Sequence, residues 1–189
     1  MTRIVTILML LSLVGCGFQS IPTAKNEVEA KFAEVQNQYK RRADLIPNLV
    51  KVVKGYASHE KETLEAVVSA RAKATSVNVD PSKLGSVQEF QKAQGALSSA
   101  LGRLMVVVER YPDLKANQNF RDLQVQLEGT ENRITVARNR YIETIKMFNN
   151  LVTVPPQSWT NSLIYKFEKM PQFEVENLKE MEKAPEVNL

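Results

Sequence analysis

The chain has 189 residues, a formal net charge of +4 at pH 7, one cysteine and one histidine. This length suits one domain with a hydrophobic core of its own. A single cysteine excludes an intramolecular disulfide, and a single histidine excludes His-based catalytic triads and multi-histidine zinc sites. The positive charge is too small to indicate nucleic-acid binding, so we expect no nucleic-acid partner.

The N-terminal segment has the features of a secretory signal. Its apolar run, Ile4 to Val14, follows Arg3 and contains no charge. A cation, a short apolar run and small residues in this order are typical of a signal peptide. The run is well short of the ~20 residues that span a bilayer. We therefore expect export rather than a membrane-spanning helix.

The apolar run ends in four residues that resemble the lipobox of bacterial lipoproteins: Leu13, Val14, Gly15 and Cys16. The resemblance implies that residues 1–15 are removed and that Cys16, then the first residue, is acylated. Residues 16–23 are expected to form the lipidated linker. The alternatives are an ordinary cleaved signal with an incidental cysteine, or an uncleaved anchor.

An acylated Cys16 predicts that the protein is held on a lipid membrane of the bacterial cell envelope, with its body outside the cytoplasm. Gly17, rather than an aspartate, follows the cysteine. In a Gram-negative host this favours the inner leaflet of the outer membrane.

Residues 25–56 carry apolar side chains at alternating steps of four and three, which is typical of a helix packed in a bundle. Arg42 occupies one core position, so its guanidinium must be paired or reach solvent; Asp44 and Glu131 are its candidate partners. Pro47 predicts a kink or a boundary, and we favour a kink because the apolar spacing continues past it. Gly55 marks a second weak point, which leaves open one bent helix or two.

The next helices are separated by clear breaks. Residues 76–85 form the clearest loop, and the spacing of Ser86 and Glu89 predicts a capping box that opens a helix. Pro112 stops that helix, and a third apolar seam then runs from Phe120 to Phe148. The sequence therefore predicts an all-α, antiparallel up-and-down bundle of three to four long helices over residues 24–155.

Residues 156–189 differ from the bundle because aromatic side chains are scattered among charges, and Pro171 and Pro185 interrupt any long helix. We expect this tail to fold back over the bundle as a short helix and a strap, with the end of the chain loose. Contact of its aromatic residues with a membrane surface or a partner is the alternative.

No pattern in the chain indicates a catalytic, metal or cofactor site. His59-Glu60 begins like the zincin motif, but Thr63 stands where the second histidine belongs. The glycines are dispersed, so no phosphate-binding loop is expected, and the paired Glu-x-x-His segments of a di-iron bundle are absent. We expect no enzyme; a carboxylate-dependent hydrolase is the minor alternative.

Two stretches, Tyr39 to Val50 and Tyr111 to Tyr141, resemble the LemA family, and the resemblance extends over residues 22–175. It implies an antiparallel helical bundle with a membrane-tethered, extracytoplasmic body and no established reaction. It also implies association with membrane metalloproteases of the heat-shock class or with other envelope proteins. Members usually have one transmembrane helix as anchor, whereas this chain has Cys16.

The residues that match the family's pattern give the candidate site: Asp44, Pro47, Asn48, Glu131, Asn132, Arg138 and Tyr141, together with Arg42. Their first interpretation is structural, with the freed backbone of a kinked first helix and a buried arginine satisfied by polar residues of the last long helix. Their second is docking of a partner. The expected function is a binding or scaffold adaptor at the envelope; a purely structural spacer is the alternative.

Overall fold

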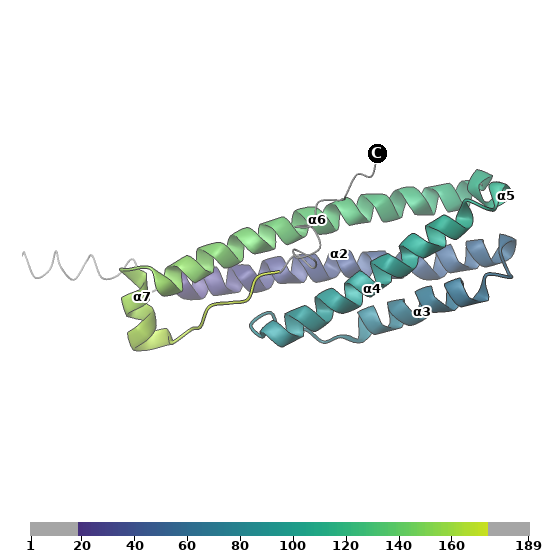
Figure 1. Cartoon of the computed structure of the whole chain (residues 1–189). Helices are drawn as coiled ribbons and strands as arrows, with labels where there is room; N and C mark the ends of the chain where they lie inside the picture. The colour runs from purple at the N-terminus through teal and green to yellow at the C-terminus, as the bar shows by residue number, and fades with distance from the viewer. Residues whose placement is uncertain (1–18, 174–189) are drawn as a thin grey trace, which may run out of the picture.

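The computed structural model describes residues 19–173, and these form an all-helical, up-and-down bundle with no strand (Figure 1). Its four long helices are α2 (Ser20–Tyr56), α3 (Lys61–Ser76), α4 (Leu84–Val108) and α6 (Gln118–Thr153). Three short helices complete it: α5 (Pro112–Ala116), α7 (Gln157–Thr160) and the π-helix η1 (Asn161–Tyr165). The predicted fold class is confirmed.

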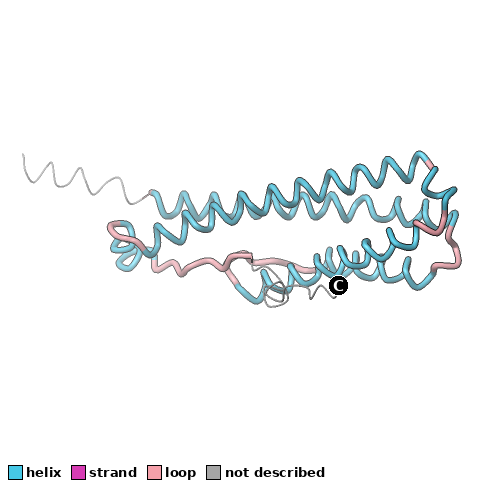
Figure 2. The backbone as a smooth tube through the Cα atoms, turned by 45° about the horizontal axis from the view of Figure 1, so that its top comes forward, coloured by secondary structure: helices cyan, strands magenta, loops and turns pink. Residues whose placement is uncertain are grey.

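The long helices form two antiparallel pairs that together make a rod (Figures 1 and 2). The backbone of α2 runs in close contact with that of α6, and α3 runs in close contact with α4. The backbones of α4 and α6 lie further apart. At about 1.5 Å per residue, the 37 residues of α2 extend about 55 Å.

The first helix ends where Gly55 predicted a break, so the bundle has four long helices rather than three. The turn that joins α2 to α3 leaves His59 exposed. The chain does not break at Pro47, because α2 is continuous through it. The predicted alternative of a helix boundary at this proline is therefore wrong.

Two predicted boundaries differ from the structure. Helix α2 begins at Ser20, so residues 20–23, which we placed in the linker, are helical. Helix α4 begins at Leu84, two residues before the predicted cap. The Ser86 hydroxyl instead accepts a hydrogen bond from the Asp80 N–H at 2.9 Å, so it stabilises the preceding loop. The capping-box prediction is wrong because that loop competes for the same hydroxyl.

The core consists of two apolar clusters. The first lies toward the start of α2 and is rich in aromatic rings; it includes Ile21, Phe32, Phe90, Tyr141 and Phe148. The second lies toward the other end and is mostly aliphatic; it includes Ile46, Leu49, Leu97, Leu104 and Phe120. Between them lies a layer of buried polar side chains, Arg42, Gln94 and Thr130. This polar layer separates the two apolar clusters.

The predicted strap is present as residues 166–173, which run back along the bundle from its end (Figure 1). The side chains of Met170 and Phe173 are buried against the first apolar cluster. Two asparagines hold the strap by its main chain. Asn161 bonds both the N–H and the carbonyl of Phe167, at 3.0 and 2.9 Å, and Asn149 bonds both groups of Met170, at 2.8 and 3.0 Å. The expected loose end, after about residue 179, lies outside the described residues.

Candidate functional site

Arg42 is the centre of the polar layer and is 2% exposed. Its Nη1 donates to Ser98 Oγ and to Glu131 Oε2, both at 2.9 Å. Its Nη2 donates to the side-chain oxygen of Gln94 at 2.8 Å and to the Gln94 carbonyl at 3.3 Å. The guanidinium also lies 5.0 Å from the centre of the Tyr39 ring. A buried cation is costly unless it is paired and hydrogen-bonded, and these acceptors meet that requirement.

The carboxylate that pairs with Arg42 is Glu131, from the last long helix. The other candidate, Asp44, is exposed on α2 and lines a different cavity of about 390 Å³ beside Arg71. The Glu131 side chain is 55% exposed, whereas that of Arg42 is 3% exposed. The ion pair therefore joins a buried cation to a carboxylate that solvent and ligands can reach.

The same network joins all four long helices. Arg42 belongs to α2, Gln94 and Ser98 to α4, and Glu131 to α6. The Gln94 amide nitrogen donates to the Ala74 carbonyl near the end of α3 at 3.2 Å. Polar networks of this kind fix one arrangement of the helices when every member is satisfied. Arg42 Nε is the exception, with no hydrogen-bond partner among the residues that the structure describes.

Pro47 changes the hydrogen bonding of the backbone carbonyl four residues earlier. A proline lacks the N–H that would bond the carbonyl of residue i−4, here Ala43. That carbonyl instead accepts a hydrogen bond from Arg71 Nε of α3 at 2.7 Å. The freed backbone group that the sequence predicted is thus satisfied by a polar side chain, but from α3 and not from the last long helix.

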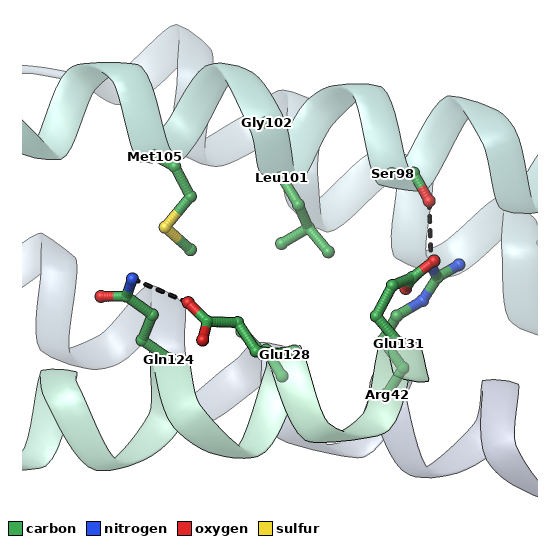
Figure 3. Close-up of a pocket in the computed structure, with 9 residues that line it drawn as sticks. Arg42, Ser98, Leu101, Gly102, Met105, Gln124, Glu128 and Glu131 are labelled. Atoms are coloured by element: carbon green, nitrogen blue, oxygen red, sulfur yellow. Dashed lines mark hydrogen bonds and ion pairs between the residues drawn. The ribbon is translucent and has the colours of Figure 1, made fainter. Parts of the chain in front are cut away.

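A groove of about 260 Å³ lies between α4 and α6 (Figure 3). Its apolar part is formed by Leu101, Met105 and Leu127. Its polar residues are Arg42, Ser98, Gln124, Glu128 and Glu131, and Gln124 donates to Glu128 at 3.0 Å. Gly102 adds no side chain, and a Cβ placed there would meet no atom within 4 Å. The groove is therefore open above this glycine.

Arg138 and Tyr141 lie further along α6, under the strap. The Arg138 guanidinium lies 5.0 Å from the centre of the Phe173 ring, and the Tyr141 ring packs edge-on against the same ring at 5.1 Å. Burial raises the pKa of the Tyr141 hydroxyl, which has no hydrogen-bond partner among the described residues. Burial also raises the pKa of Tyr39, against the opposing effect of the Arg138 and Arg42 cations.

The remaining candidates do not join either group. Pro47 and Asn48 are exposed on α2, and Asn132 is exposed on α6 next to the residue that binds Arg42. The structure thus divides the predicted set into three parts. Arg42 and Glu131 form an ion pair at the groove, Arg138 and Tyr141 each contact Phe173 of the strap, and the others are separate surface residues. Sequence reasoning missed Ser98, Arg71 and the two strap-binding asparagines.

Similarity to known proteins identifies the family of this chain. The LemA family model matches residues 31–189, which include Arg42, Gln94 and Glu131. The chain belongs to the LemA family. A similar curated LemA protein, from Metamycoplasma hominis, is 26% identical over 144 residues, which is 76% of this chain and 62% of that protein.

Other relatives of this LemA chain are magnetosome proteins. MamQ of Magnetospirillum gryphiswaldense is 23% identical over 175 residues, covering 82% of this chain and 64% of MamQ. MamQ 1 of Paramagnetospirillum magneticum is 22% identical over 161 residues, covering 75% of this chain and 59% of the relative. The matches therefore span about three fifths of the length of these curated relatives.

Two features are missing from the part of the LemA chain that the structure describes. Within residues 19–173, none of the helices combines the length and the hydropathy of a membrane span. In the same range, no three side chains of His, Cys, Asp or Glu are grouped as they would be to hold a metal ion.

Proposed function

We propose that this LemA protein is an extracytoplasmic adaptor of the bacterial cell envelope that holds a partner protein in the groove between α4 and α6. The observation that carries this proposal is the groove itself, an opening of about 260 Å³ with an apolar floor and charged groups on its edges. Sites of this composition bind apolar side chains and use a few polar groups to fix their orientation.

The walls of the groove are well suited to binding because the polar layer fixes them. Arg42 bonds Ser98 of α4 and Glu131 of α6 at the same time, each at 2.9 Å. A preorganised site loses little conformational freedom when a partner binds. The exposed Glu131 carboxylate has lone pairs left for a donor on the partner.

The proposed occupant is an apolar side chain of a helix or an extended segment, with a hydrogen-bond donor beside it. Membership of the LemA family supports a membrane-associated setting, and the family resemblance favours a membrane metalloprotease or another envelope protein as the source of that segment. Acylation of Cys16 is the proposed tether, supported by the lipobox-like residues Leu13, Val14 and Gly15 before it.

Photocrosslinking in cells tests the groove. A photoreactive residue replaces Gln124, which lines the groove, or Arg121, which lies one turn earlier on α6 and does not line it. We expect a discrete crosslinked membrane protein from position 124 and none from position 121. Equal crosslinking from both positions would contradict a specific groove site.

Fatty-acid labelling tests the tether separately. Cells grown with an alkyne fatty acid are expected to label the wild-type protein and to leave Cys16→Ser unlabelled. Equal labelling of the two proteins would overturn acylation at Cys16.

The two alternatives make different predictions. A structural spacer requires only the length of the rod, so it predicts no crosslink at position 124 and an unchanged phenotype for groove variants that fold. A hydrolase predicts turnover in a broad substrate screen of the mature chain and loss of that turnover in Glu131→Gln. Either result would replace the adaptor proposal.

A further inference from the structure

The end of the rod where α2 begins carries a group of exposed apolar side chains. Between Val154 and Ile164, four large hydrophobic residues are exposed: Val154 by 52%, Trp159 by 64%, Leu163 by 80% and Ile164 by 51%. Val154 directly follows α6, and the other three belong to the short α7–η1 segment, which lies across the end of the bundle (Figure 1). We call this group the apolar tip. Single exposed hydrophobic residues are normal, but such a cluster at one end requires an explanation.

The π-helix η1 has a polar residue on its buried face and apolar residues on its exposed face, the reverse of the usual arrangement. Its buried residue is Asn161, which is 7% exposed, while Leu163 and Ile164 point to solvent. The Asn161 amide donates to the carbonyls of Val152 and Phe167, at 3.3 and 2.9 Å. These bonds fix the inner face of the segment by polar contacts, so the apolar side chains are held outward rather than left there by a lack of packing.

The apolar tip lies beside the first turn of α2. Ile21 of α2 and Val152 of α6 belong to the same core cluster, and Tyr165 packs against it. Lys25, one turn further along α2, lies 5.5 Å from the centre of the Phe167 ring. Cys16 is four residues before Ser20, and an extended chain covers at most about 14 Å over that distance. An acyl chain on Cys16 would therefore keep the apolar tip within reach of the bilayer surface.

We infer that the apolar tip inserts into the interfacial region of the same membrane that holds the acylated Cys16, and that it sets the orientation of the rod. This inference rests on the proposed tether. Trp159 is the kind of side chain that prefers the headgroup level, and Leu163 and Ile164 supply area for the acyl boundary.

The charges around the apolar tip fit an anionic lipid surface. Lys166 and Lys169 follow η1 directly and are exposed, with Glu168 as the one acid between them. Exposed cations close to a bilayer are attracted to its anionic headgroups. A protein partner would not explain why the group sits at the tethered end, whereas a bilayer does.

Insertion of the apolar tip would hold the groove at a defined height. Arg42 lies 22 residues after Ser20 along an unbroken helix, a rise of about 33 Å. A rod fixed at both Cys16 and its tip would stand on the membrane and present the α4–α6 groove at about that distance. A rod fixed at Cys16 alone would lie at any angle.

The test uses Trp159, which is the only tryptophan of the chain. The full-length gene product is purified from membranes and reconstituted into phosphatidylethanolamine–phosphatidylglycerol vesicles, with or without lipids brominated on their acyl chains. We expect brominated lipid to lower Trp159 emission about twofold, with a blue-shifted maximum, as for an interfacial indole. The double variant Leu163→Ser, Ile164→Ser should lose most of the quenching.

Matched controls keep the result interpretable. Val106 and Val125 are also exposed, by 72% and 67%, but lie away from the tip, so Val106→Ser, Val125→Ser should quench like the wild type. Thermal unfolding confirms that each variant folds. Unquenched emission at the wavelength of an exposed indole overturns the inference. A blue shift without quenching also overturns it and points to a second copy of the chain on the tip.

Mass spectrometry of the same sample separates this inference from the tether. Acylated Cys16 with unquenched Trp159 overturns the tip contact and leaves the tether in place. Quenched Trp159 without an acyl group overturns the tether and supports the tip contact.

Discussion

Arg42 places a full positive charge between the two apolar clusters of the bundle. The buried Gln94 side chain offsets part of the cost of burying this charge. Gln94 accepts from Arg42 with its oxygen and donates to the Ala74 carbonyl with its nitrogen. Glu131 contributes from the solvent side. A residue with both roles has no apolar substitute of the same shape.

Replacing Gln94 with leucine should therefore destabilise the fold. The change leaves a buried guanidinium with one fewer acceptor and a buried carbonyl without its donor, and we expect a loss of about 2–3 kcal/mol in the free energy of unfolding. Urea denaturation measures this, with Gln88→Leu as the control because Gln88 is exposed on the same helix. Equal midpoints for the two variants would contradict the role given to the polar layer.

Tyr141 gives a prediction about alkaline pH. Burial raises the pKa of its hydroxyl above the ordinary value of 10.0, so the folded state holds that proton more tightly than the unfolded state. This contribution to stability is complete below pH 10 and is lost as the pH rises above 10. In Tyr141→Phe, the free energy of unfolding should fall less steeply above that pH than in the wild type.

The same variant tests the unpartnered hydroxyl. Because Tyr141 has no hydrogen-bond partner among the described residues, Tyr141→Phe should change stability at neutral pH by less than about 1 kcal/mol. A larger loss, measured by chemical denaturation at pH 7, would mean that the hydroxyl is bonded in solution.

At the scale of the elements, α2 is continuous through Pro47 because α3 supplies a replacement donor. Arg71 bonds the Ala43 carbonyl that the proline leaves free. In the wild-type background, which has Pro47, Arg71→Met should lower the free energy of unfolding by about 1–2 kcal/mol. In a Pro47→Ala background, the alanine N–H supplies the helical bond and the loss should be smaller by about 0.5–1 kcal/mol. A double-mutant cycle with no coupling would contradict the proposal that Arg71 compensates for Pro47.

The strap is held by asparagines rather than by helix packing alone. Asn149→Ala removes both hydrogen bonds to the Met170 main chain, and we expect a cost of about 1–2 kcal/mol with faster amide exchange in residues 167–173. Hydrogen–deuterium exchange detected by mass spectrometry measures the exchange rate of this segment. The exposed neighbour Asn150 provides the control Asn150→Ala, which should leave the exchange unchanged.

Helix extents were largely predictable because apolar spacing persists along whole helices, whereas single contacts were not. The capping box at Ser86 was wrong, since the hydroxyl is taken by a loop residue whose approach local sequence does not encode. Arg71 was missed because its partner is 28 residues away on another helix. The choice between Asp44 and Glu131 for Arg42 depended on how α6 is rotated against α2, which spacing alone leaves open.

At the scale of the whole molecule, the polar layer and the groove are parts of one arrangement. The aromatic cluster and the strap occupy the end of the bundle where α2 begins, and the aliphatic cluster occupies the opposite end. Arg42 lies between them and also contributes to the groove. A partner that bonds Glu131 would therefore act on a network that reaches all four long helices, which gives binding a route to the rigidity of the rod.

The central claim is that the α4–α6 groove holds a partner of the envelope, and blocking the groove tests it most directly. Gly102→Leu places a side chain over the groove, while Gly85→Leu adds the same side chain elsewhere on α4; a Cβ at either glycine meets no atom within 4 Å. Both variants should fold at least as well as the wild type, since leucine favours helices by about 1 kcal/mol over glycine. The measurement is the yield of the crosslink from position 124 in cells. We predict that Gly102→Leu abolishes it and Gly85→Leu leaves it intact; an undiminished crosslink in Gly102→Leu would contradict the account.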